Sequence, residues 1–169
     1  FKDSLENIFQ LNEKVVVITG AAGLLGRQHA EAIAAFGGTP ILLDLDNTPV
    51  KELAEDLKDR YHVPAKGMIV DITDENSISL NCNQLVERFG NIYGLVNNAA
   101  NNPKVENNEK ENFSRLENFP LDVWNQDVAV GLTGAFLCAK YYGNAMVKNP
   151  KGGSIVNISS DLGLIAPDQ

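Results

Sequence analysis

The chain has 169 residues, of which 44% are hydrophobic and 21% are charged. This composition excludes wholesale disorder, and the length predicts a single domain over residues 1–169 that can bury a hydrophobic core. The 14 Lys and Arg against 22 Asp and Glu give a net charge of −8. That balance argues against a nucleic-acid partner, because a nucleic-acid binder needs basic residues to neutralise phosphates.

Short apolar runs alternate with stretches of helical periodicity along the chain. We expect strands at residues 14–19, 39–43, 67–70, 92–96 and 154–158. We expect helices at residues 24–36, 49–61, 74–89 and 121–146. This alternation predicts an α/β fold, a doubly wound, Rossmann-like parallel sheet with helices on both faces in three α/β/α layers. Such sheets bind ligands at the carboxyl ends of their strands, so chemistry is expected in the loops that follow them.

A glycine-rich turn lies between the first expected strand and the first expected helix. Thr19-Gly20-Ala21-Ala22-Gly23-Leu24-Leu25-Gly26 spaces its glycines as G-x-x-G-x-x-G. The missing side chains let the backbone approach a pyrophosphate, and the helix start offers N–H groups and its positive dipole end to the anion. The cofactor-binding residues predicted here are Gly20, Ala22, Gly23, Leu24, Leu25 and Gly26.

An acidic residue ends the second expected strand. Asp44 lies 18 residues beyond Gly26, where a carboxylate can accept hydrogen bonds from the ribose of an adenosine, with Leu45 beside it. A 2′-phosphate about 4 Å away would be repelled by about 4 kcal/mol at an effective dielectric constant near 20. The sequence therefore predicts NAD in preference to NADP. Asp44 as a simple turn cap, and Asp46 as the ribose acceptor, remain alternatives.

One segment interrupts the alternation of strands and helices. Residues 101–118 contain six Asn and four Glu and show little periodicity. We expect a polar surface insertion here, either a solvated loop or, because it leaves the carboxyl edge of the sheet, a segment that shapes substrate specificity.

The ordered set of motifs resembles the short-chain dehydrogenase/reductase family over residues 14–160. The motifs that carry the resemblance are TGAAGLLG at 19–26, Asp71-Ile72, Asn97-Asn98-Ala99-Ala100 and Ile155-Val156-Asn157-Ile158-Ser159-Ser160. The resemblance implies that Asp71 and Ile72 border the adenine. It also implies that Asn98, Ala99 and Ala100 lie along the cofactor and that Ser160 is the catalytic serine, whose hydroxyl orients the substrate carbonyl or alcohol.

Two features depart from the family pattern. Gly131 stands where the family often carries an Asn in the long helix, so no catalytic role is transferred to it. No Tyr-x-x-x-Lys pair occurs between Ser160 and residue 169, although the family takes its general acid/base from that pair. We expect the chain to be a piece of a longer enzyme, with its fold incomplete at the C-terminus, catalytically silent as it stands, and with the Tyr and Lys beyond residue 169.

The expected helix at 121–146 is apolar around much of its circumference. We expect Trp124 and Phe136 to anchor it by packing, and a second subunit to cover the side that the sheet leaves open. The resemblance implies the same, because the equivalent helix commonly forms an oligomer interface in the family. At least a dimer is therefore predicted.

Cysteine content and hydropathy indicate the cellular compartment of the protein. Cys82 and Cys138 lie far apart and outside any Cys/His cluster, so they read as reduced thiols, and no metal site is predicted. No apolar run approaches the roughly 20 residues of a membrane span. A cytoplasmic protein without membrane partners is expected.

The combined reading is an NAD-dependent oxidoreductase that moves a hydride between nicotinamide and a small carbonyl or secondary-alcohol substrate. Two alternatives stay open. One is a nucleotide-binding module without chemistry, and the other is a sugar-nucleotide epimerase or dehydratase, which more often shows the G-x-x-G-x-x-G spacing.

Overall fold

A five-stranded parallel sheet organises the computed structural model, which describes residues 8–101 and 116–160. The strands are β1 (Val15–Thr19), β2 (Thr39–Asp44), β3 (Lys66–Ile69), β4 (Gly94–Asn97) and β5 (Ser154–Asn157). Their order is β3-β2-β1-β4-β5, and each neighbouring pair is parallel. The order reverses at β1, so the sheet is doubly wound, as the sequence predicts, and its ligand-binding crevice lies at the carboxyl ends of β1 and β4.

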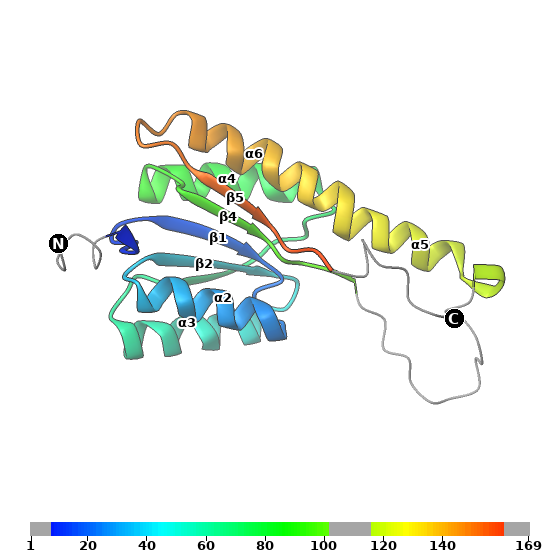
Figure 1. The fold of residues 1–169 in the computed structure, drawn as a ribbon, viewed down its shortest axis with the longest axis horizontal. Coiled ribbons are helices and arrows are strands. Elements are labelled where there is room, and N and C mark those ends of the chain that lie inside the picture. The colour runs from blue at the N-terminus through cyan, green and yellow to red at the C-terminus, as the bar shows by residue number, and fades with distance from the viewer. Residues whose placement is uncertain (1–7, 102–115, 161–169) are drawn as a thin grey trace.

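Helices cover both faces of the sheet. They are α2 (Leu24–Ala35), α3 (Asn47–Tyr61), α4 (Glu75–Phe89), α5 (Leu121–Val128) and α6 (Ala135–Val147), with a short 3₁₀ turn η1 (Leu116–Asn118) and a π-helical segment η2 (Ala129–Gly134). Figure 1 shows α2 and α3 on one face and α4 and α6 on the other. The predicted α/β/α layering is therefore confirmed.

Alternate residues of β1 supply two separate cores. Val15 and Val17 belong to the cluster under α4 and α6, whereas Val16 and Ile18 belong to the cluster under α2 and α3. A strand buried on both faces must be apolar at every position, which explains the continuous β-branched run. Each fully buried aliphatic side chain contributes about 1.5–3 kcal/mol.

The element boundaries follow local capping chemistry. Every predicted strand and helix is present, with ends that differ from the prediction by at most two residues. The second helix begins at Asn47 because the Asp46 carboxylate accepts a hydrogen bond from Thr48 N at 3.1 Å. Asp74 caps α4 in the same way through Asn76 N.

The long helix differs from the prediction in two respects. It is interrupted by η2, where one turn widens to π-helical hydrogen bonding around Gly131. The expectation that Trp124 and Phe136 anchor the helix is wrong for the described part of the chain, because these side chains are 58% and 62% exposed. For Trp124 the reason is visible in Figure 1, where α5 extends beyond the end of the sheet, so that no strand lies beneath it.

The polar insertion, membrane spans and metal sites that the sequence analysis considered can be compared with the described residues. Of the polar stretch 101–118, residues 102–115 lie outside the described residues, and only Asn101 and η1 are placed. Within the described ranges, no helix is long and apolar enough to cross a membrane. The same residues hold no group of three or more His, Cys, Asp or Glu that could bind a metal ion.

Candidate functional site

The glycine turn after β1 is shaped by close backbone contacts. Gly20 has φ +62°, and a Cβ there would lie 2.8 Å from Ala99 Cα in the loop after β4. A Cβ on Gly26 would collide with the Gly20 carbonyl oxygen, so this glycine lets the first turn of α2 pack against the bend. Glycine is required at both positions, for a left-handed conformation at Gly20 and for close approach at Gly26.

The start of α2 is open to an acceptor from outside the helix. Gly23 is the N-cap in an extended conformation, and no side chain accepts a hydrogen bond there. Leu24 and Leu25 follow, with side chains 84% and 53% exposed. An uncapped helix start combines unpaired N–H groups with the positive end of the dipole, which suits a phosphate.

The Asp44 carboxylate joins the end of β2 to the glycine turn. Its Oδ2 accepts a hydrogen bond from Ala22 N at 2.9 Å, and its Oδ1 accepts one from Leu45 N at 2.8 Å. An ionised carboxylate can accept about four hydrogen bonds, so Asp44 keeps capacity for ribose hydroxyls. The alternative acceptor, Asp46, is engaged as the cap of α3 and does not line the cavity beside the turn.

Thr19, a residue that was not predicted as part of the site, links the glycine turn to the loop after β4. Its Oγ1 accepts hydrogen bonds from Asn98 N at 3.0 Å and Ala99 N at 3.1 Å. In return, Asn98 Nδ2 donates to the carbonyl oxygens of Thr19 and Gly20 at 3.0 and 3.1 Å. The signal that could have revealed Thr19 is a lone hydroxyl at the end of an otherwise apolar strand.

The loop after β3 forms the opposite wall. Asp71 Oδ1 accepts hydrogen bonds from Thr73 N at 2.8 Å and from Thr73 Oγ1 at 2.7 Å, an Asx turn that leads into α4. Ile72 packs against the π-helical segment, where a Cβ on Gly134 would lie 2.8 Å from Ile72 Cδ1. Gly134 thus allows the long helix to close one side of the site.

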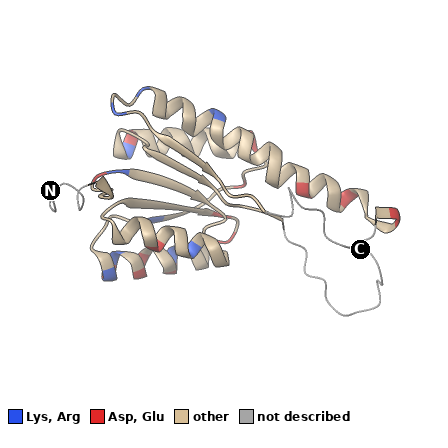
Figure 2. Ribbon diagram, viewed as in Figure 1, with Lys and Arg blue, Asp and Glu red and all other residues tan. Residues whose placement is uncertain are grey.

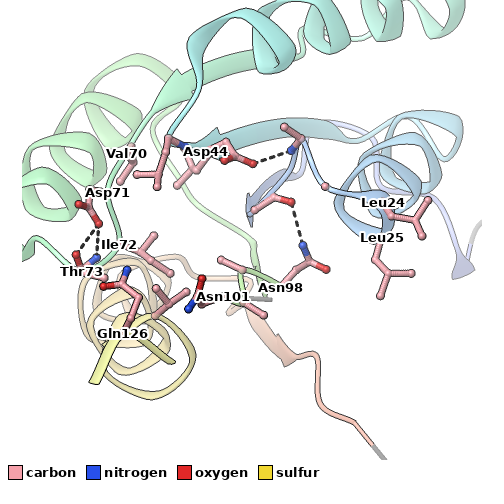
Figure 3. Close-up of a pocket in the computed structure, with 18 residues that line it drawn as sticks. Leu24, Leu25, Asp44, Val70, Asp71, Ile72, Thr73, Asn98, Asn101 and Gln126 are labelled. Atoms are coloured by element: carbon pink, nitrogen blue, oxygen red, sulfur yellow. Dashed lines mark hydrogen bonds between the residues drawn. The ribbon is translucent and has the colours of Figure 1, made fainter. Parts of the chain in front are cut away.

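These walls enclose a cavity of about 660 Å³ at the carboxyl edge of the sheet (Figure 3). The predicted residues that line it are Gly20, Ala22, Gly23, Leu24, Leu25, Asp44, Leu45, Asp71, Ile72, Asn98, Ala99 and Ala100. Gly26 does not line it, because it is buried under the turn. Leu43, Val70, Thr73, Asn101, Gln126 and Val130, none of them predicted as site residues, complete the lining.

A second hollow of about 670 Å³ adjoins the first and contains Ser160. The two hollows share six lining residues, which are Leu25, Ile72, Asn98, Ala99, Ala100 and Val130. Gly131 lines the second hollow, and a Cβ there would meet nothing within 4 Å. Ser160 therefore lines a hollow next to the glycine turn, together with some of the predicted cofactor residues.

A buried carboxamide supports this second hollow. Asn97 Nδ2 donates to Asn157 Oδ1 at 2.8 Å and to Ala135 O at 3.4 Å, joining the ends of β4 and β5 to the start of α6. Asn97 is only 7% exposed. Its bonds hold the strand that leads to Ser160 against the irregular part of the long helix.

The sequence model of a family described as short chain dehydrogenase matches residues 14–168. The chain belongs to the short-chain dehydrogenase family. It is 35% identical over 160 residues to trans-4-hydroxycyclohexanecarboxylate dehydrogenase of Sinomonas cyclohexanicum, covering 90% of this chain and 57% of that protein. The chain thus spans little more than half the length of the curated relatives it matches.

Solved structures of a dehydrogenase and a reductase share the fold. NAD+-bound xylitol dehydrogenase superposes with a TM-score of 0.81 at 27% identity, covering 93% of this chain and 56% of that one. An NADPH-dependent 3-quinuclidinone reductase from Rhodotorula rubra gives 0.82 at 26% identity, covering 98% and 59%. Members with either nucleotide are therefore close to this chain in structure.

The residues of this short-chain dehydrogenase fit a dinucleotide. The bend at Gly20 and the uncapped start of α2 leave bare backbone facing a cavity whose volume suits a cofactor. Asp44 places a carboxylate beside the bend, and Ile72 adds an apolar side chain to the lining. The geometry thus combines bare backbone, a carboxylate and an apolar wall, which are the chemical features that a dinucleotide site needs.

Proposed function

We propose that the protein is an NAD-dependent oxidoreductase that transfers a hydride between nicotinamide and a small carbonyl or secondary-alcohol substrate. The observation that carries this proposal is the uncapped start of α2 beside the Asp44 carboxylate, at the switch point of the sheet. Residues 1–169 would form a single dinucleotide-binding domain within that enzyme. Bound there, the nicotinamide would supply the group that accepts or donates the hydride.

Each part of the chain would then have a separate task. The backbone at Gly20, Ala22 and Gly23 would hold the pyrophosphate, and Asp71 and Ile72 would border the adenine. Asn98 to Ala100 would direct the cofactor towards the second hollow, where the Ser160 hydroxyl would orient the substrate oxygen. The general acid/base, the Tyr and Lys of the family, is expected beyond residue 169.

The preference for NAD rests on the position of Asp44. Its Oδ2 lies 2.9 Å from the nitrogen of Ala22, inside the turn that would hold the phosphates. A 2′-phosphate near this carboxylate would be repelled by about 4 kcal/mol before screening. The similar structures include one bound to NAD+ and one that depends on NADPH, so the family alone does not decide the nucleotide.

The test compares Asp44→Asn with Asp46→Asn in the full-length protein. Both changes neutralise one carboxylate while keeping its size, but only Asp44 lines the cavity. We expect Asp44→Asn to reduce the ratio of NADP to NAD dissociation constants by at least about tenfold, and Asp46→Asn to leave it unchanged. The ratio would be measured by titrating each nucleotide calorimetrically. Equal ratios in wild type and Asp44→Asn would refute the role of Asp44.

The activity itself is tested by following NADH formation by the full-length protein with a panel of secondary alcohols. We expect turnover with at least one member and its loss in Ser160→Ala, with NAD affinity retained. Tight NAD binding without turnover on any alcohol or carbonyl would favour the binding module instead.

Quaternary structure and location are part of the same proposal. Leu121, Trp124, Leu132 and Phe136, here called the apolar stripe, are between 58% and 71% exposed along α5, η2 and the start of α6. A second subunit would cover this stripe. Cys82 and Cys138 are free and buried, which supports a reducing compartment such as the cytoplasm.

A further inference from the structure

A separate hollow of about 670 Å³ lies between α3 and the start of β3. β3 is an edge strand, and Lys66 is its first residue, so the hollow opens at the amino end of the strand. The cofactor cavity lies at the carboxyl ends of the strands, and the two hollows share no lining residue. The hollow on α3 therefore belongs to a different site.

Cations outnumber anions around this hollow. Lys51 and Lys58 project from α3, Lys66 comes from β3, and Arg88 comes from the last turn of α4. Two carboxylates also line it, Glu52 and Glu55. A local excess of positive charge is unexpected in a chain whose net charge is −8. Figure 2 shows basic and acidic residues interspersed along α3.

The cations at the β3 end of this hollow are incompletely neutralised. Lys58 pairs with Glu55 at 2.7 Å. In the described part of the chain, none of the ion pairs includes Lys66 or Arg88. The Arg88 guanidinium instead lies 5.4 Å from the centre of the Phe89 ring. Partial burial and then the charges of Arg88 and Lys58 hold the pKa of Lys66 below its ordinary value, so these cations are close enough to interact.

The floor of the hollow is fixed by tight packing. A Cβ on Gly67 would collide with the Val50 carbonyl oxygen, so β3 and α3 are in direct backbone contact at this point. Ala54 and Ala65 are each 2% exposed and form a small apolar base. The lysines and the arginine therefore surround an open depression with a closely packed floor.

We propose that this hollow binds a compact anion with two or more negative charges, a phosphate ester or a di- or tricarboxylate. The guanidinium of Arg88 can donate two parallel hydrogen bonds to either group, and Lys66 and Lys58 add point charges beside it. The volume lies within the range of small-molecule sites, so the ligand can carry an organic body that rests on Ala54 and Ala65. Such binding would relieve the repulsion among the three cations.

The experiment titrates pyrophosphate and citrate into the full-length protein at constant ionic strength, with NAD present so that the glycine turn is occupied. We expect saturable binding of at least one probe, and the tighter of the two identifies the ligand as a phosphate or a carboxylate. In Lys66→Gln/Arg88→Gln the affinity should fall by at least about tenfold, because two charge-assisted contacts are lost. Amide chemical shifts of Ala65 and Gly67 should move on binding.

Lys148→Gln/Lys151→Gln is the matched control, since it removes the same charge from exposed positions that do not line the hollow. Its affinity for the probes should change less than about twofold.

Lys58→Gln provides a second test if Lys66→Gln/Arg88→Gln impairs folding. It should also weaken binding of the probes. An absence of saturable binding of either probe, or equal affinities in wild type and Lys66→Gln/Arg88→Gln, would overturn the proposal whether or not NAD binds.

Discussion

One hydroxyl holds together two loops of the candidate site. Thr19 Oγ1 accepts the N–H groups of Asn98 and Ala99, and Thr19 is only 1% exposed. Thr19→Val keeps the shape of the side chain but leaves these two donors without their acceptor. Each buried unsatisfied donor costs about 1–3 kcal/mol, so the two together should lower the free energy of unfolding by about 2–6 kcal/mol. Urea denaturation would measure it.

The conservative change Thr19→Ser is the control for the hydroxyl. Serine keeps the acceptor and removes only a methyl group, so its cost should be about 1 kcal/mol, the value of one buried carbon. NAD affinity should follow the same order, with Thr19→Ser close to wild type. If Thr19→Val and Thr19→Ser were equally stable, the hydroxyl would not be what links the two loops.

The residue scale also shows how far the sequence could predict the site. The positions of the glycine turn and of Asp44 at the edge of the cavity could be predicted because they depend on local spacing after a strand. Gly26 was expected to face the phosphate, but it lies under the turn, because its task is to let α2 approach Gly20. The contacts of Thr19 join residues nearly 80 positions apart, and no local pattern encodes that pairing.

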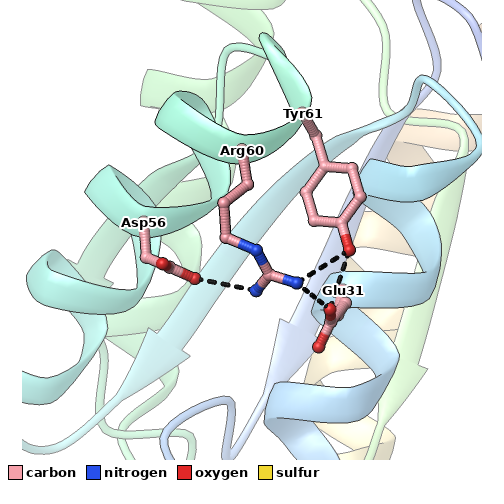
Figure 4. Close-up of polar contacts among 4 residues, drawn as sticks. All are labelled: Glu31, Asp56, Arg60 and Tyr61. Carbon is pink, nitrogen blue, oxygen red and sulfur yellow. Dashed lines mark hydrogen bonds and ion pairs between the residues drawn. The ribbon is translucent and has the colours of Figure 1, made fainter.

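At the scale of elements, a cluster of polar side chains joins α2 to α3 (Figure 4). Glu31 on α2 accepts hydrogen bonds from Arg60 and from Tyr61 Oη on α3. The bond from Tyr61, followed by that from Arg60, holds the pKa of Glu31 below its ordinary value. A lowered folded-state pKa means that ionised Glu31 stabilises the fold above the ordinary glutamate range. This contribution is lost as the pH falls through the lowered value.

Glu31→Gln should therefore lower the melting temperature slightly at neutral pH, and the difference from wild type should vanish in acid. The effect is expected to be small because the cluster is exposed to solvent. Glu55→Gln is the control, since Glu55 pairs with Lys58 inside α3 and links no second helix. A Glu31→Gln difference that persisted below the lowered pKa would contradict an electrostatic link between the helices.

Helices and strands could be predicted where the local pattern of apolar residues alone determines the structure. The run from Val15 to Ile18 is apolar at every position, so a strand buried on both faces was expected and is found. The π-helical turn at Ala129–Gly134 was not predictable, because it depends on how the helix meets Ile72 and Asn97 across the sheet. The exposure of Trp124 was missed because the spacing of apolar residues shows that they share one face of a helix. It does not show whether a strand lies beneath that face.

At the scale of the whole molecule, the apolar stripe is the surface that the described residues leave uncovered. Leu132 is 67% exposed, and it shares a hollow of about 490 Å³ with Trp124 and Phe119. The charged residues of α5 are all acidic (Figure 2), so two copies would meet through apolar contact with their carboxylates kept at the rim. A stable contact of this kind buries about 1,200–2,000 Å² in total.

Leu132→Glu tests whether this stripe joins subunits. Burying an unpaired carboxylate in an apolar interface is costly, so we expect the full-length protein to shift from a dimer or larger assembly to a monomer, as measured by light scattering coupled to gel filtration. Leu80→Glu places the same charge on α4, where Leu80 is 64% exposed, and should leave the mass unchanged. Both leucines are exposed in a single chain, so neither change should disturb the fold of the monomer. A lower mass for Leu132→Glu alone would therefore indicate an interface at the stripe. A monomeric wild-type protein, or equal masses for wild type and Leu132→Glu, would contradict a subunit interface at the stripe.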